Sequence, residues 1–138
     1  MLFNAGTLGQ LRSSVVVGFE KACLDIDHAS TWARLDTDEL AIEDTIMDCD
    51  TLFFPNQQGV DPDGASLPDF FYRGANNHAT DPGLTSPFSE TSPDFSPATG
   101  SPLLGAAVTP EDSFFDGVDF IGAVNPEKDW TQASWIAE

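Results

Sequence analysis

Several aspartates in this chain stand two residues apart, a spacing that puts both carboxylates on the same face of a β-strand. The pairs are Asp25 with Asp27 and Asp48 with Asp50. Polysaccharide hydrolases use paired carboxylates as acid and base, so these pairs are the first candidates for an active site. Because each pair lies in or beside an expected turn of a very acidic chain, we interpret them as solvated turn residues instead.

Calcium binding is the second chemistry that the aspartates allow. The segments "DTDE" and "DPDG" place carboxylates two residues apart in expected loops, at Asp36, Asp38, Asp61 and Asp63. Hard cations such as Ca²⁺ prefer oxygen ligands of this kind. Neither segment continues to the distal glutamate of a recognised calcium loop, so ordinary turns are the alternative. Ca²⁺ is the only cofactor that we consider for this sequence.

The other reactive side chains form no recognisable catalytic or metal pattern. His28 and His78 have no cysteine or histidine at metal-ligand spacing and are expected in loops. Cys23 and Cys49 are too few for a disulfide framework. They could pair if the fold brought them together, but buried free thiols are the favoured expectation. No G-x-S-x-G motif of a serine hydrolase occurs.

The three tryptophans could bind sugar rings or finish a fold. Trp32, Trp130 and Trp135 could form a stacking platform for carbohydrate. The favoured interpretation is that Trp130 and Trp135 pack as a lid over the end of the structure.

The charge limits the possible partners. The chain has 138 residues, with 23 acidic against 5 basic side chains and a net charge of −18. This balance argues against nucleic acid and anionic membrane surfaces, which need lysine and arginine. No segment approaches the ~20 apolar residues of a membrane-spanning helix. The N-terminal sequence lacks the basic region and cleavage site of a signal peptide.

Strand propensity dominates the N-terminal part of the chain. Residues 8–26 and 40–54 are rich in Val, Ile, Thr and Phe, which favour strands. An amphipathic helix over 36–50 is the alternative for the second run. Residues 27–39 between the runs are expected to form a loop.

The two runs also align as a weak internal repeat of 31 residues. Leu11 falls on Ile42, Ser13 on Asp44 and Val15 on Ile46. Repeats of this period are typical of solenoids, in which each unit buries its apolar face against its neighbours. The short polar side chains of Ser13 and Asp44 suit a corner between two strands.

Residues 55–110 differ in composition from the segments on either side. Nine of the ten prolines lie there, so long helices are excluded. Aromatic and leucine residues recur through the same stretch, which favours an ordered wrapping loop over a disordered linker.

Three segments resemble a known group of proteins. "DPGLTSP…SPDFSPATGSPLLGAA" (81–107) resembles the terminal coil of right-handed parallel β-helix proteins of bacterial surfaces. "FFDGVDFIGAVNPEKDWTQASW" is similar to the C-terminus of secreted bacterial β-helix proteins, which end in a pattern like "FFD-x-VDYIGAF…DWT-x-GW". In that C-terminal segment, Ala133 and Ser134 stand where a glycine usually precedes the last tryptophan. "RSSVVVGFEKACLDID" (12–27) looks like a late coil of the same pectin-lyase-like group.

The resemblance implies an all-β fold, a right-handed parallel β-helix of about three rungs. Residues 1–54 would form rungs, 55–80 an excursion loop, and 81–138 a terminal coil with an aromatic cap. The expected cap residues are Phe114, Phe115, Phe120, Trp130 and Trp135. Because such proteins are several hundred residues long, we expect the chain to be a C-terminal piece.

The implied function is structural or adhesive rather than catalytic, in a secreted or cell-surface bacterial protein. The alternative is a carbohydrate-binding or lyase-like module that holds acidic polysaccharide through calcium. A lyase would need a basic residue near its metal, and Arg12 is the only one in a clear strand. A groove with convergent aspartates and basic or aromatic residues would favour the alternative. We expect no membrane insertion, and self-association through an uncovered N-terminal rung.

Overall fold

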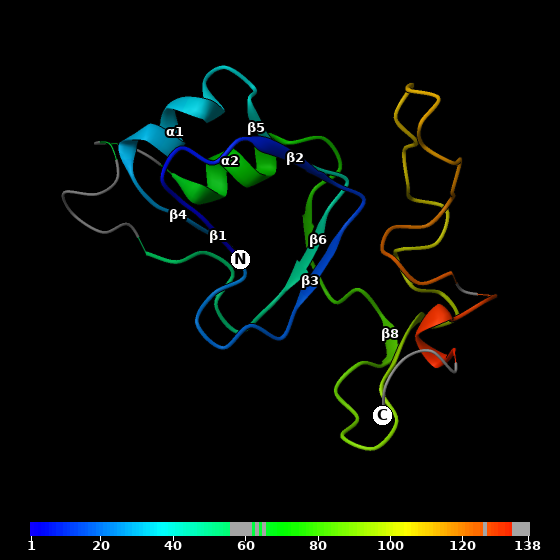
Figure 1. Cartoon of the computed structure of the whole chain (residues 1–138). Helices are drawn as coiled ribbons and strands as arrows, with labels where there is room; N and C mark the ends of the chain where they lie inside the picture. Colours follow the sequence, from blue (N-terminus) through cyan, green and yellow to red (C-terminus); the bar gives the residue numbers. More distant parts are fainter. Residues whose placement is uncertain (56–61, 63, 65, 126, 134–138) are drawn as a thin grey trace. The chain divides into compact units, whose positions relative to one another are not determined.

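The computed structural model describes residues 1–55, 62, 64, 66–125 and 127–133. In chain order its elements are β1 (Leu2–Phe3), β2 (Gly9–Arg12), β3 (Val15–Val17), β4 (Asp25–Ile26), α1 (Ala29–Leu35), β5 (Leu40–Glu43), β6 (Ile46–Asp48), α2 (Leu67–Arg73), β7 (His78–Ala79), β8 (Leu84–Ser86), β9 (Asp94–Pro97) and the 3₁₀ helix Trp130–Gln132 (Figure 1). The chain divides into two compact units, Met1–Asp81 and Pro82–Glu138.

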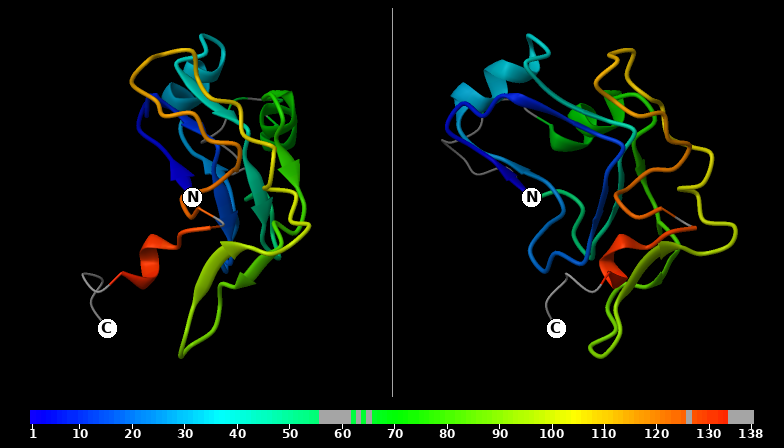
Figure 2. Two further views of the ribbon diagram at one scale, coloured as in Figure 1. Left: turned by 90° about the vertical axis from the view of Figure 1, so that its right-hand side faces the viewer. Right: turned by 45° about the vertical axis from the view of Figure 1, so that its right-hand side comes forward.

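Short parallel strand pairs organise the first unit. β1 pairs with β4, β2 with β5, and β6 lies between β3 and β7. Figure 2 shows β3 and β6 side by side. Leu11 pairs with Ile42 and Val15 with Ile46, so the predicted 31-residue register is confirmed.

The corner between paired strands is also as predicted. Ser13 and Asp44, between β2 and β3 and between β5 and β6, both adopt left-handed backbone, with φ of 47° and 50°. Asn76, just before β7, has the same conformation, with φ of 54°. Asn and Asp tolerate this region better than most residues because their short polar side chains can hydrogen-bond locally.

The predicted fold class is wrong: the chain is not a parallel β-helix. The described strands are short and lie in several small sheets of two or three strands, with two α-helices among them and no solenoid or closed sheet in the described residues. Within the described residues, no strand pairs in parallel beyond β7, and β8 pairs with β9 in antiparallel orientation. The segment expected to form the terminal coil forms a β8–β9 hairpin and loops instead.

Two expected loops contain helices. α1 lies within residues 27–39, and α2 within residues 55–80. α2 begins where the Ser66 hydroxyl accepts a hydrogen bond from the Asp69 N–H, at 3.2 Å, and Pro68 occupies its first turn. The alternative helix over 36–50 is wrong, since β5 and β6 occupy that run.

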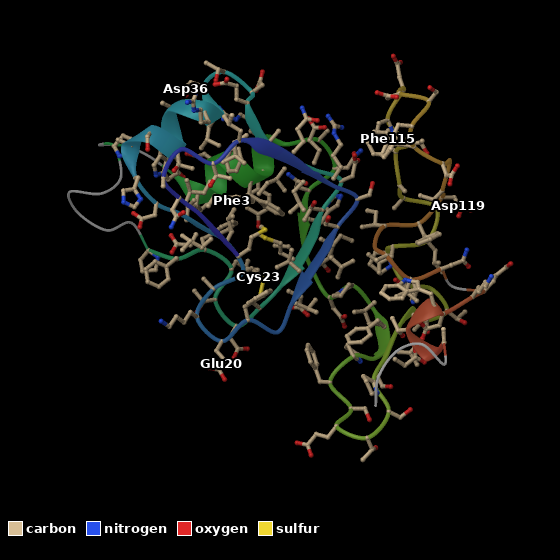
Figure 3. All side chains as sticks on the ribbon, in the orientation of Figure 1. Phe3, Glu20, Cys23, Asp36, Phe115 and Asp119 are labelled. Atoms are coloured by element: carbon tan, nitrogen blue, oxygen red, sulfur yellow. A yellow bond between two sulfur atoms is a disulfide. The ribbon has the colours of Figure 1, made fainter. Side chains whose placement is uncertain are left out.

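The core of the first unit is closed by a disulfide between Cys23 and Cys49 (Figure 3). The expectation of free thiols is therefore wrong, and the Cα atoms lie 5.7 Å apart. The bond is part of a buried cluster drawn from β3, the residues leading into β4, β4 itself, α1, β5, β6 and α2: Val16, Cys23, Leu24, Ile26, Trp32, Leu35, Leu40, Ile42, Met47, Leu67, Phe70 and Phe71. The parallel pairing explains the bond, because it brings the segment after β3 beside the segment after β6.

The second unit has a smaller apolar centre. The buried Ser101 hydroxyl donates to the Pro82 carbonyl at 2.6 Å and accepts from the Leu103 N–H at 3.1 Å. Leu103 and Ile121 are both buried, and the Ile121 N–H donates to the Leu103 carbonyl at 3.0 Å. Phe120 is buried and forms an antiparallel bridge with Leu104.

Candidate functional site

The candidate site is a groove in the first unit where α1 ends beside β5 and α2. It has a volume of about 390 Å³, and its polar lining includes Asp36, Asp38, Glu43 and Arg73. A neighbouring hollow of about 350 Å³ shares Asp36, Phe70 and Arg73 with it. Arg73 therefore stands at the junction of two depressions.

Two contacts position the Arg73 guanidinium. Its Nη2 donates to the Leu35 carbonyl at the end of α1, at 3.4 Å, and its Cζ lies 5.7 Å from the centre of the Phe70 ring. A guanidinium at this distance from an aromatic face is within range of a cation–π attraction. Among the ion pairs within the described part of the chain, none involves Arg73.

The turn after α1 carries the two predicted calcium ligands that the structure describes. Asp36 ends α1, and Asp38 has left-handed backbone with φ of 55°. Figure 3 shows Asp36 beside the end of α1. Both side chains are exposed at the groove. Asp61 and Asp63, the other two predicted ligands, lie outside the described residues.

Glu39 forms hydrogen bonds across the same turn. Its Oε2 accepts from Arg34 Nη1 and from the Thr37 hydroxyl, both at 2.8 Å, and its N–H donates to the Arg34 carbonyl at 3.0 Å. The hydrogen bond from Arg34, helped by that from Thr37, lowers the pKa of Glu39 below its ordinary value. The turn that presents Asp36 and Asp38 is therefore held by side-chain contacts of its own.

The groove combines one cation, exposed carboxylates and the aromatic ring of Phe70 among its lining residues. Such a surface can bind a polyhydroxylated ligand that carries an acidic group, with the guanidinium on the anion and the carboxylates accepting from hydroxyls. Within the described residues, no group of three or more His, Cys, Asp or Glu side chains is arranged to hold a metal ion.

The aspartate pairs considered first lie apart from this groove. Asp25 is in β4, and Asp27 accepts from the N–H of His28, at 2.9 Å, immediately before α1. Asp48 and Asp50 are exposed at and beyond the end of β6. His28 precedes α1, whereas His78 begins β7 rather than lying in a loop.

The tryptophans do not share a face in the described structure. Trp32 is buried in α1, with its Nε1 donating to the Ile26 carbonyl at 3.2 Å, so it is not an exposed stacking surface. Trp130 is 43% exposed and donates to the Ala123 carbonyl at 2.7 Å. Trp135 lies outside the described residues.

The remaining cap residues differ in burial. Phe120 is buried, whereas Phe114 is 82% exposed and Phe115 is 48% exposed. The rings of Phe114 and Phe115 pack edge to face, with centroids 5.3 Å apart. Phe115 projects from an acidic segment that also carries Asp119, as Figure 3 shows.

Sequence reasoning missed Arg73, Phe70 and Glu43 as lining residues. The motif "SLPD" (66–69) could have indicated α2, because serine followed three residues later by an acidic residue is a helix-start pattern. Arg73 then falls in the last turn of that helix. Its approach to α1 depends on tertiary packing and has no local signature.

No protein-family model matches the chain, and neither a curated protein nor a solved structure shows significant similarity to it. Over the described residues, no helix is both long and apolar enough to span a membrane.

Proposed function

We propose that this chain is a structural or adhesive, non-catalytic segment of a secreted or cell-surface bacterial protein. The observation that carries the proposal is the disulfide between Cys23 and Cys49. Disulfides persist in oxidising compartments and on cell surfaces, and are rare in reducing cytosol. The bacterial source rests on the resemblance of residues 81–138 to the ends of secreted bacterial proteins.

The charge and the exposed aromatic rings agree with a surface role. A net charge of −18 keeps a protein soluble in salty surroundings. Phe114 and Phe115 are 82% and 48% exposed and their ring centroids lie 5.3 Å apart, so together they form a small exposed apolar patch suited to adhesive contacts.

Antibody labelling of the source cells tests the location. We expect antibodies raised against the chain to label intact cells, and non-reducing gels of the native protein to show the intramolecular disulfide. Labelling that requires permeabilised cells, or a fully reduced native protein, would refute the proposal. The purified chain should release no product from acidic polysaccharides; sustained product release would identify an enzyme instead.

The groove at Arg73 favours a second candidate function, the binding of acidic polysaccharide. A groove with aspartates and basic or aromatic residues is the feature expected of a polysaccharide-binding module, and Asp36, Asp38, Arg73 and Phe70 line one groove. A uronic acid carboxylate on Arg73, with hydroxyls on the aspartates, is the contact that we propose.

Glycan-array binding with calcium or with chelator tests this candidate. We expect Arg73→Gln and Asp38→Asn each to weaken binding of acidic glycans, and asparagine tolerates the left-handed backbone at 38. The matched controls are Lys128→Gln and Asp116→Asn, exposed changes in the second unit. Equal effects in variants and controls, or no glycan binding by the wild-type chain, would exclude the groove. If calcium binds, the melting temperature will be higher in calcium than in chelator.

A further inference from the structure

The acidic residues are absent from one end of the sequence. Residues 1–19 contain no aspartate or glutamate, and all 23 acidic residues lie between Glu20 and Glu138. Arg12 is the only charged side chain in residues 1–19, and it forms an ion pair with Glu43 of the neighbouring strand. This segment therefore contributes no carboxylate to a chain that is otherwise strongly negative.

The same residues form open strand edges. Within the described structure, β1, β2 and β3 each pair with a single strand, namely β4, β5 and β6. The N–H groups of Gly9 and Ser13 donate toward β5, at 2.8 and 3.3 Å to Glu39 and Glu43 carbonyls. Because successive N–H groups of a strand point to opposite sides, the N–H of Gln10 faces the open edge.

The same segment carries exposed apolar side chains. Leu2, Leu8 and Phe19 are 54%, 58% and 50% exposed. Leu11 and Val15 are half-buried, whereas Ile42 and Ile46, with which they pair, are 2% and 1% exposed. Residues 1–19 thus combine unpaired backbone groups with exposed apolar side chains, a combination that promotes pairing between chains.

We propose that residues 1–19 form a self-association surface, on which a second copy of this chain packs its own residues 1–19. Two acidic segments repel each other, whereas two copies of residues 1–19 bring together segments that carry no carboxylate side chain. A two-fold contact is self-complementary and places β2 of one copy antiparallel to β2 of the other. The buried area would include Leu2, Leu8 and Phe19 from both copies.

Sedimentation velocity of the 138-residue chain over a wide concentration range tests the proposal. We expect a monomer–dimer equilibrium, and slower hydrogen exchange of the Gln10 amide in the dimer. Leu8→Lys/Phe19→Lys places two like charges on each edge and should weaken dimerisation about tenfold or more. The matched control is Phe88→Lys/Val108→Lys, which changes two exposed apolar residues of the second unit and should leave dimerisation unchanged.

The side chains changed in both double variants are at least 50% exposed, so circular dichroism and melting should match those of the wild type. The single variant Leu8→Lys provides a milder form of the same test. A wild-type chain that stays monomeric at all concentrations would refute the proposal. So would equal weakening by the edge and control variants, or Gln10 exchange that does not depend on concentration.

Discussion

Asn77 is the buried side chain that joins the two walls of the Arg73 groove. Its Nδ2 donates to the carbonyls of Ile42 in β5, at 2.7 Å, and Phe71 in α2, at 2.8 Å. Its Oδ1 accepts from the Thr45 N–H at 3.0 Å. One amide therefore satisfies three backbone groups from the two elements and the turn after β5, and fixes the helix against the strand.

Asn77→Ala should lower the free energy of unfolding by about 3 kcal/mol, because it leaves buried backbone groups without partners. Urea denaturation followed by circular dichroism would measure the loss. The control Asn4→Ala removes an exposed amide and should change stability by less than about 0.5 kcal/mol. Similar values for the two variants would contradict the bridging role of Asn77.

Glu39 provides a pH-dependent prediction at the same scale. Because the hydrogen bonds from Arg34 and Thr37 lower the pKa of Glu39 in the folded chain, the folded state binds this proton less readily than the unfolded state. The stabilisation is therefore present above the ordinary pKa of glutamate and is lost as pH falls through the folded pKa. An NMR titration of the Glu39 carboxyl should show the low value.

Arg34→Gln should raise the Glu39 pKa toward its ordinary value, since Arg34 is the larger cause of the shift. Thr37→Val should raise it by less. An unchanged titration in Arg34→Gln would show that the turn is held by other contacts.

At the scale of elements, α2 approaches β5 so closely that only glycine fits at its end. A Cβ at Gly74 would lie closer than 3.0 Å to the Ile42 carbonyl oxygen and to Asn77 Nδ2. The first of these atoms belongs to the backbone of β5 and cannot rotate away. Gly74 thus sets the distance between the helix and the strand.

Gly74→Ala should destabilise the chain by about 1–3 kcal/mol, the usual cost of overpacking. Thermal unfolding would measure it. At Gly117 the nearest atom to an added Cβ is the Thr109 hydroxyl, at 3.9 Å, so Gly117→Ala is the matched control and should be tolerated. Unfolding at the wild-type temperature in Gly74→Ala would show that α2 and β5 can separate without cost.

The sequence indicates which residues of the paired strands lie side by side, but not how many strands continue the parallel pairing. The pattern of Leu11, Ser13 and Val15 repeats at Ile42, Asp44 and Ile46 because paired parallel strands place equivalent residues side by side. This similarity led to the prediction of a longer solenoid. Two similar coils cannot show whether the next segment continues the pairing, and here the chain forms the antiparallel β8–β9 hairpin.

The groove and the disulfide could not be derived from local patterns. The turn at Asp36 and Asp38 was recognised from its own residues, but Arg73 is 35 residues beyond Asp38 and reaches α1 only through tertiary packing. Cys23 and Cys49 are 26 residues apart, and the parallel pairing of β3 with β6 brings the segments that carry them together. Contacts of this kind depend on the whole arrangement of the unit.

At the scale of the molecule, the larger of the two cores lies in the first unit. The buried cluster, the disulfide and the groove lie entirely within Met1–Asp81. Pro82–Glu138 has its own smaller set of buried residues, among them Leu103, Phe120 and Ile121. This division predicts that the first unit has enough buried apolar area and cross-linking to fold by itself.

A fragment of residues 1–81 should therefore unfold cooperatively with its disulfide intact. Trp32 is its only tryptophan, and it is 8% exposed, so its fluorescence should be that of a buried indole and should shift to longer wavelength in urea. Reduction should lower the stability by about 3–4 kcal/mol, the entropic contribution of a cross-link between residues 26 apart in sequence. The fragment 82–138 is the control and should unfold with lower cooperativity. A red-shifted, gradually changing Trp32 spectrum in the oxidised 1–81 fragment would show instead that the second unit is required for the core to form.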